Sequence, residues 1–201
     1  MEESLLIPAG ESLSELVEKH SRFIAQCFYI SDEKEAKEIV KRLWELHPGA
    51  RHIVWAFVIG EKNSRTMGMS DDGEPKGTAG RPVLNVLSGS GITNVLCTVV
   101  RYFGGTLLGT GGLVKAYSQS AKDAIEKLPT KPLVKETTFS FRISYDTYDS
   151  VKYLLRKFEA QIIDENFSED IKIKAVAKES LFESIENEIL QLTAGKAKIE
   201  K

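Results

Sequence analysis

Glycine is unevenly distributed along this 201-residue chain, and its distribution limits how the middle of the chain can fold. Eleven of the 15 glycines lie within residues 68–112. Glycine is favoured where the backbone adopts a positive φ angle or approaches another group closely, so this density predicts functional loops. The apolar stretch 94–100 lies between two such loops and reads as a strand, and helical patterns follow the loops over 82–87 and 113–128. We expect Thr110 to cap the second of these helices.

The residues before the glycine-rich region predict a helix between strands. Asp32, followed three residues later by Glu35, resembles the capping box that begins many helices. Apolar residues then recur at helical spacing until His47-Pro-Gly ends the pattern. The expected strands cover 21–31, 52–60 and, after a turn at 61–64, residues 64–69.

Pro129 and Pro132 interrupt the chain and predict a domain boundary. We expect one domain over residues 1–131 and a second over 132–201. The order in the second domain is strand, helix, two strands, helix and short strand, which is the split βαβ plan of ferredoxin-like domains. The expected strands are 135–144, 161–167, 171–178 and 196–200, and the expected helices are 147–159 and 181–192.

Composition limits the classes of protein that this chain can belong to. With 42% hydrophobic and 28% charged residues it is an ordinary folded chain. A formal net charge of −2 excludes a strongly basic nucleic-acid binder, so any contact with RNA needs a local patch or backbone groups. Cys27 and Cys97 lie in apolar runs without a C-x-x-C pair, which indicates buried, reduced thiols. We see neither a signal peptide nor an apolar run of about 18 residues, and therefore expect a cytoplasmic protein without membrane contact.

The first glycine-rich loop, residues 70–82, combines carboxylates with backbone N–H groups. In a functional interpretation, the loop and the following helix N-terminus bind an anion or a polar ligand. In a structural interpretation, the carboxylates form a turn and cap a helix, and the residues alone slightly favour this. The carboxylates are those of Asp71, Asp72 and Glu74, and the groups expected at a ligand are Lys76, Gly77, Thr78, Gly80 and Arg81.

The second glycine-rich loop is close to both nucleotide-binding fingerprints but matches neither. Gly104 and Gly109 are spaced as in a P-loop, but Thr110 stands where the phosphate-binding lysine is required. Val114 replaces the third glycine of a dinucleotide-binding pattern. Close packing of helix on strand is the competing explanation, although two such loops within about 30 residues favour one shared site. The candidate binding residues here are Arg101, Gly104, Gly105, Gly109, Gly111, Gly112 and Lys115.

His52 completes the set of candidate site residues. Three scattered histidines and two cysteines in apolar runs do not supply the roughly four N or S ligands of a zinc site, so we expect no metal and no cofactor. Ser70, His52 and Asp72 could form a triad on paper, but the chain lacks the Gly-x-Ser-x-Gly elbow. A lone histidine at a strand start is more often a hydrogen-bonded surface residue.

Four motifs together resemble a known family. They are Lys19-x-Ser-Arg-Phe-Ile24, His47-Pro-x-Ala-x-His52, Ser70-Asp-Asp-Gly-Glu-Pro-x-Gly-Thr-Ala-Gly-x-Pro82 and Val100-Arg-Tyr-Phe-Gly-Gly-x-x-Leu-Gly-x-Gly-Gly-Leu-Val-x-Ala-Tyr117. Their long, gap-free match resembles the signature of the IMPACT/YigZ family and covers about residues 15–128. The C-terminal part is similar to the small second domain of bacterial members.

The resemblance implies an α+β fold with two domains. The first would be a left-handed βαβ domain like domain IV of elongation factor G. This fold is also called ribosomal protein S-five domain-2-like. The second would be a ferredoxin-like βαββαβ domain like domain V of the same factor. Eukaryotic relatives regulate translation by competing for the co-activator of a kinase that phosphorylates an initiation factor.

Three hypotheses follow for the function. The first is a non-enzymatic protein linked to translational initiation, which contacts RNA, a ribosomal component or a translation-related protein through the glycine-rich loops. The second is an enzyme acting on a small phosphorylated or carboxylated substrate. Its acid/base or metal-holding groups would be His52, Asp71, Asp72 and Glu74. The third and weakest is a protein–protein module that uses the sheet of residues 133–201.

Overall fold

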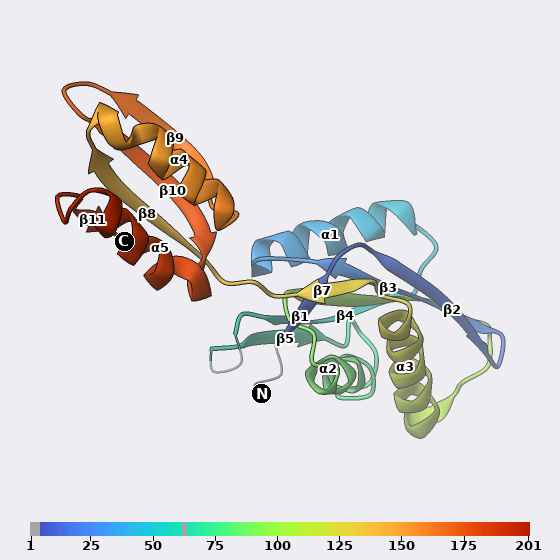
Figure 1. Cartoon of the computed structure of the whole chain (residues 1–201). Coiled ribbons are helices and arrows are strands. Elements are labelled where there is room, and N and C mark those ends of the chain that lie inside the picture. Colours follow the sequence, from blue (N-terminus) through green and yellow to red (C-terminus); the bar gives the residue numbers. More distant parts are fainter. Residues whose placement is uncertain (1–4, 62–63) are drawn as a thin grey trace. The chain divides into compact units, whose positions relative to one another are not determined.

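The computed structural model describes residues 5–61 and 64–201. The chain forms two compact units, Met1–Leu133 and Val134–Lys201, which we call the first unit and the second unit. Both combine helices with antiparallel sheets, which confirms the expected α+β fold with two domains (Figure 1). Among the helices of the described residues, none has the length and apolar character needed to cross a membrane.

A five-stranded antiparallel sheet forms the centre of the first unit, with the order β2-β3-β6-β4-β5. Because β3 and β4 both pair antiparallel with β6, they run parallel to each other, and helix α1 connects them along the chain. The strands are β2 (Ser12–Glu18), β3 (Ser21–Tyr29), β4 (His52–Ile59), β5 (Thr66–Ser70) and β6 (Val95–Tyr102). Lys62 and Asn63, the middle of the expected turn before β5, lie outside the described residues.

Helices cover both faces of this sheet (Figure 1). Helix α1 (Glu33–Leu46) packs on one face, where its Leu43 joins a core with Ile53 and Phe57. Helices α2 (Gly80–Gly89) and α3 (Gly109–Glu126) pack on the other face. The Asp32 carboxylate caps α1 by accepting hydrogen bonds from two backbone N–H groups, as the sequence predicts. The sheet is therefore a buried middle layer that holds the loops at its ends in place.

The structure corrects two details of the sequence analysis. Helix α3 begins at Gly109 with Leu108 as its N-cap, so Thr110 lies inside the first turn and does not cap the helix. The segment between Pro129 and Pro132 is not a simple break, because strand β7 (Thr130–Pro132) pairs antiparallel with strand β1 (Leu6–Pro8). The C-terminal end of the first unit is thus hydrogen-bonded to the beginning of the described chain.

The two cysteines lie directly opposite each other on neighbouring strands. Cys27 of β3 pairs with Cys97 of β6, and both are fully buried free thiols. A hydrogen bond with Cys27, together with burial, raises the pKa of the Cys97 thiol well above its ordinary value. The Cys97 thiol therefore remains protonated, and both cysteine side chains are apolar parts of the core.

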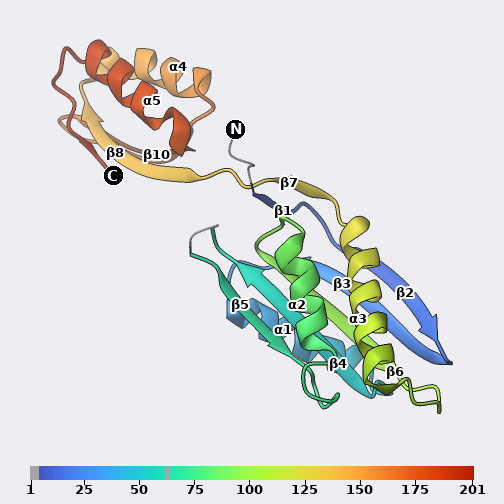
Figure 2. The same ribbon diagram turned by 90° about the horizontal axis from the view of Figure 1, so that it is seen from below.

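The second unit is a four-stranded antiparallel sheet of order β11-β8-β10-β9, with helices α4 and α5 on one face (Figure 2). This element order and sheet order agree with the split βαβ plan. Along β10, the alternating Ile171 and Ile173 are buried while Lys172 and Lys174 are exposed. The elements are β8 (Glu136–Ile143), the 3-10 turn η1 (Tyr145–Thr147), α4 (Tyr148–Lys157), β9 (Gln161–Phe167), β10 (Ile171–Lys178), α5 (Glu179–Leu192) and β11 (Ile199–Glu200).

Candidate functional site

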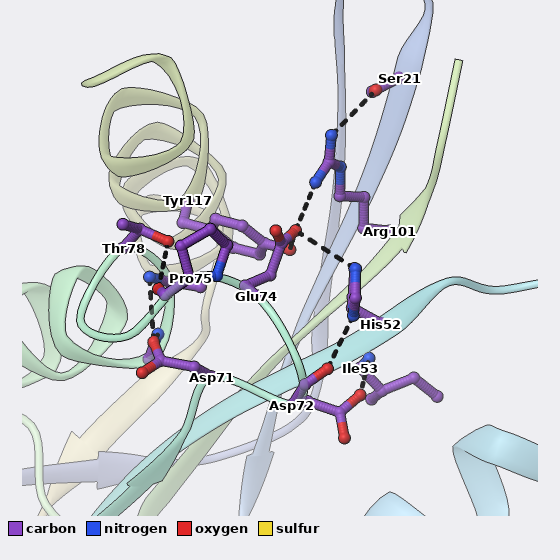
Figure 3. A network of polar contacts seen from close by, with 12 residues as sticks. Ser21, His52, Ile53, Asp71, Asp72, Glu74, Pro75, Thr78, Arg101 and Tyr117 are labelled. Carbon is purple, nitrogen blue, oxygen red and sulfur yellow. Dashed lines mark hydrogen bonds and ion pairs between the residues drawn. The ribbon is translucent and has the colours of Figure 1, made fainter. Parts of the chain in front are cut away.

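Four separate stretches of sequence meet at one end of the sheet of the first unit. In the strand register, His52 lies opposite Arg101, and Arg22 lies opposite Tyr102. The starts of β3 and β4 and the end of β6 therefore share this end of the sheet. Both glycine-rich loops leave the sheet here, since the first follows β5 and the second follows β6. Each of the four sequence motifs contributes at least one residue to the resulting polar network (Figure 3).

The carboxylate of Glu74 is the centre of this network (Figure 3). Its Oε1 atom accepts a short hydrogen bond from Arg101 Nη1 and a 2.7 Å hydrogen bond from the hydroxyl of Tyr117. Only 8% of Glu74 and 5% of Arg101 are exposed, and Tyr117 is fully buried. A buried carboxylate is stable only when it is paired and hydrogen-bonded, and these two partners satisfy that requirement. These two hydrogen bonds connect the first loop to strand β6 and to helix α3.

Tyr117 stays protonated at this position. Its burial, and then its hydrogen bond to the Glu74 carboxylate, raise the pKa of the Tyr117 phenol far above its ordinary value. The hydroxyl therefore acts as a hydrogen-bond donor and not as a base.

His52 links Glu74 to the turn before it. The Nδ1 atom of His52 lies 2.7 Å from the backbone oxygen of Asp72. A carbonyl oxygen only accepts hydrogen bonds, so Nδ1 carries a proton, and Nε2 lies 4.0 Å from Glu74 Oε1. The Asp72 carboxylate accepts a 2.6 Å hydrogen bond from the backbone N–H of Ile53 and so fastens the loop to β4. Asp72 itself has a φ of +45°, and Gly73 follows with +85°, which produces the sharp turn.

Asp71 occupies the anion position of the first glycine-rich loop. Its carboxylate accepts hydrogen bonds from the backbone N–H groups of Gly77 (2.8 Å), Ala79 (3.1 Å) and Gly80 (2.8 Å), at the start of α2. Partial burial raises the pKa of Asp71, but these three N–H groups outweigh it and hold the pKa below the ordinary 3.8. The N–H groups of Gly77 and Gly80 are thus bound to a carboxylate of the chain itself. Thr78 is buried, and its hydroxyl donates to the backbone oxygen of Pro75.

Ser21 holds the second loop, and the sequence analysis missed it. Its Oγ atom accepts hydrogen bonds from the backbone N–H of Gly104 (3.2 Å) and from Arg101 Nη2 (3.4 Å). Gly104 packs against the His20 backbone so closely that an added Cβ would lie 2.0 Å from the His20 carbonyl carbon. Tyr117 was also absent from the candidate residues, although both Ser21 and Tyr117 lie inside the four motifs.

Most of the remaining candidate residues are exposed, but Arg101 is not. Arg101 is buried against Glu74, so its guanidinium group is not available to RNA. The side chains of Lys76, Arg81 and Lys115 are exposed. Gly105, Gly109 and Gly111 are exposed as well, and Gly112 is half-buried. Within residues 5–61 and 64–201, no group of three or more His, Cys, Asp or Glu side chains is placed to hold a metal ion.

Comparison with known proteins identifies the family. Residues 19–125 match the Impact N-terminal domain, and residues 141–196 match a domain of unknown function, DUF1949. The chain is 34% identical to an IMPACT family member of Haemophilus influenzae, over 97% of this chain and 95% of that protein. It is 40% identical to the IMPACT family member YigZ of Escherichia coli, over 82% of this chain and 81% of that protein. A crystal structure of a hypothetical protein matches 99% of this chain and 97% of its own length, at 34% identity and a TM-score of 0.78. The chain belongs to the IMPACT family.

Proposed function

We propose that this chain is a non-enzymatic binding protein linked to translation, which contacts RNA or a ribosomal component through the glycine-rich end of the first unit. Membership of the IMPACT family supports the link to translation, because the resemblance to that family implies a regulatory role in initiation. The arrangement of the loops supports binding, because the four motifs form one hydrogen-bonded network at this end of the sheet, while Lys76, Arg81 and Lys115 near it are exposed.

The N-terminus of helix α3 is the observation that carries this proposal. The helix spans 18 residues and begins with Gly-Thr-Gly-Gly, and no side chain of the described residues caps it. Its first N–H groups and the positive end of its dipole therefore suit a phosphate oxygen. Exposed Lys115 lies in the second turn of the same helix and adds a positive charge. The N-terminus of α2 differs, since Asp71 already accepts hydrogen bonds there.

The carboxylates of the first loop favour binding over catalysis. Asp71 and Asp72 accept hydrogen bonds from backbone N–H groups, and Glu74 is paired with Arg101. An acid/base mechanism needs a carboxylate that reaches the substrate, whereas Glu74 is nearly inaccessible. Because these negative charges are engaged within the fold, they oppose the approach of a phosphate less than free carboxylates would.

Salt-dependent RNA binding tests this proposal. We would measure the anisotropy of a labelled single-stranded RNA, and co-sedimentation with ribosomal subunits, at several salt concentrations. Binding should weaken as the salt concentration rises, because contacts with phosphates release counterions from the RNA. The variant Arg81→Glu/Lys115→Glu should bind RNA roughly tenfold more weakly and with a smaller salt dependence.

The control is Lys122→Glu, which changes an exposed lysine about two turns further along α3 and should leave binding unchanged. No binding of RNA or subunits at low salt, or equal binding by Arg81→Glu/Lys115→Glu and Lys122→Glu, would contradict the proposal.

A further inference from the structure

The two faces of the sheet in the first unit are covered unequally. In the described part of the chain, helices α2 and α3 pack on one face, whereas α1 alone packs on the other (Figure 1). Among the described residues, the core beneath α1 contains side chains from β3, β6 and β4 but none from edge strand β5. A groove of about 540 Å³ lies between α1 and strands β4 and β5. This volume is within the range of pockets that bind ligands.

The wall and the floor of this groove are apolar and regular. Ala36, Val40 and Trp44 line the wall at intervals of four residues along α1. The rings of Trp55 and Phe57 form the floor, stacked 5.9 Å apart with an angle of 6° between their planes. The Phe57 ring lies directly over Gly68 of β5, where an added Cβ would come within 2.5 Å of it.

The rim of the groove combines exposed apolar side chains with positive charge. Trp44 is 38% exposed and Met67 is 53% exposed. Lys37 and Lys41 follow the same side of α1, both exposed, and neither forms an ion pair or hydrogen bond within residues 5–61 and 64–201. Glu33, at the start of α1, is the acidic residue of the lining. The groove thus has a net positive rim on a chain whose formal net charge is −2.

We infer that this groove binds an acidic amphipathic helix of a partner protein, which lies beside α1 over β4 and β5. Such a helix would supply the second helix that this face of the sheet lacks. Its apolar stripe would fill the groove, as in other helix-in-groove complexes, and its acidic residues would meet Lys37 and Lys41. The flexible side chains of Met67 and Met69 can adapt to its surface. The groove is built from residues other than those of the proposed RNA contact, so the two proposals stand or fall separately.

The two tryptophans make the groove directly observable. The chain contains only Trp44 and Trp55, and both line the groove, so the intrinsic fluorescence of the full chain reports on this site. We would select binders from a displayed library of random 16-residue peptides on the full chain. Synthetic copies of the enriched peptides would then be titrated while tryptophan emission is recorded.

Enriched peptides should carry apolar residues at helical spacing with neighbouring Asp or Glu, and should shift tryptophan emission to the blue. Their affinity should fall roughly tenfold or more for Lys37→Glu/Lys41→Glu, both of which are exposed positions, and should be unchanged for Lys122→Glu.

Five results would overturn the inference. Enriched peptides with alternating apolar residues would indicate strand addition to β5, and basic or uncharged peptides would contradict the role of the lysines. Equal binding to the full chain and to Lys37→Glu/Lys41→Glu would place the peptides elsewhere. If acrylamide does not quench the tryptophans of the free chain, the groove is already filled by this chain. If the chain forms a dimer that Lys37→Glu/Lys41→Glu converts to a monomer, the groove is filled by a second copy.

Discussion

At the scale of single residues, Glu74 explains how a polar network can lie inside the first unit. Removing a carboxylate from water costs several kcal/mol unless its oxygens find charged or hydrogen-bonded partners. Arg101 and Tyr117 both bond to Oε1, and His52 Nε2 lies 4.0 Å from the same atom. Because these partners come from different elements, each depends on the others for its own burial.

This dependence predicts strong energetic coupling between Glu74 and Arg101. Arg101→Met leaves the Glu74 charge buried without its cation and should lower the free energy of unfolding by about 3–5 kcal/mol. Adding Glu74→Gln to Arg101→Met removes the unpaired charge, so the double variant should recover about 1–3 kcal/mol relative to the sum of the single changes. Urea unfolding of the four proteins, followed by tryptophan fluorescence, measures the cycle. Additivity within about 0.5 kcal/mol would show that the pair does not act as a unit.

Asp71 gives stability a defined pH dependence. Its pKa is lower in the fold than its ordinary 3.8, so its contribution is present above 3.8 and is lost as the pH falls through the folded-state value. Asp71→Asn should therefore lower the free energy of unfolding by about 2 kcal/mol at pH 7, with a smaller difference below pH 3.8. Urea unfolding of both proteins at pH 7, 5 and 3 tests this. A difference that does not change with pH would mean that the carboxylate charge is unimportant.

The site could be predicted from sequence only as a set of residue types. The two glycine-rich stretches contain Glu74 and Arg101, which the structure joins in one polar network, whereas ligand binding by these stretches stays a prediction. The partners could not be predicted, since the bond between Arg101 and Glu74 depends on how β6 and the first loop come together. The sequence analysis placed Arg101 among the candidate binding residues, whereas the fold buries it against Glu74.

At the scale of elements, the glycines of the two loops have different physical roles. Gly104 has no room for a side chain, because the His20 backbone lies against it in the turn between β2 and β3. Gly111 lies in the first turn of α3, where an added Cβ meets nothing within 4 Å. Packing thus requires glycine at position 104, whereas a Cβ at position 111 has open space.

Substitution by alanine separates these roles. Gly104→Ala should lower the free energy of unfolding by about 3 kcal/mol, because backbone must move to make room. Gly111→Ala should raise it by about 0.5–1 kcal/mol, because alanine favours the helix and restricts the unfolded chain. Thermal unfolding of both variants measures the difference. A loss of stability in Gly111→Ala similar to that of Gly104→Ala would contradict the assigned roles.

Elements with a strong local pattern were predictable, whereas the short strands β1 and β7 were not. Helix α1 follows from Asp32, Glu35 and the spacing of its apolar residues, all within residues 32–46. Strands β1 and β7 pair residues 6–8 with residues 130–132, and no local sequence pattern predicts this pairing. Thr110 looked like a cap because threonine commonly is one, but the helix starts earlier at Gly109.

At the scale of the whole molecule, each unit has its own core. Apolar clusters lie on both faces of the sheet in the first unit, and another lies between the sheet and helices of the second unit. The units divide between Leu133 and Val134, two residues beyond the boundary expected from the prolines. The difference arises because β7 still belongs to the first unit.

Fragments that end on either side of β7 test this division. Residues 1–133 should fold alone and unfold cooperatively. Residues 1–129 lack β7 and also the hydrogen bond from Leu133 N to Leu5 O, and should be about 1–2 kcal/mol less stable than residues 1–133. Urea unfolding of both fragments, followed by tryptophan fluorescence, measures the difference. Equal stability would show that β7 is not an integral part of the first unit.

The reaction of the two opposed cysteines with an alkylating reagent would measure how often the first unit opens. Cys27 and Cys97 are the only thiols in the chain, and both lie at the centre of the sheet with no exposed surface. Both side chains belong to the core that α2 and α3 cover, so an alkylating reagent reaches them only when this core opens, and the labelling rate under native conditions measures how often it opens. The second unit has no thiol and is silent in this experiment. Substitutions at Glu74 or Gly104 should speed labelling about tenfold for each 1.4 kcal/mol of stability that they remove, whereas exposed changes such as Lys122→Glu should not change the rate.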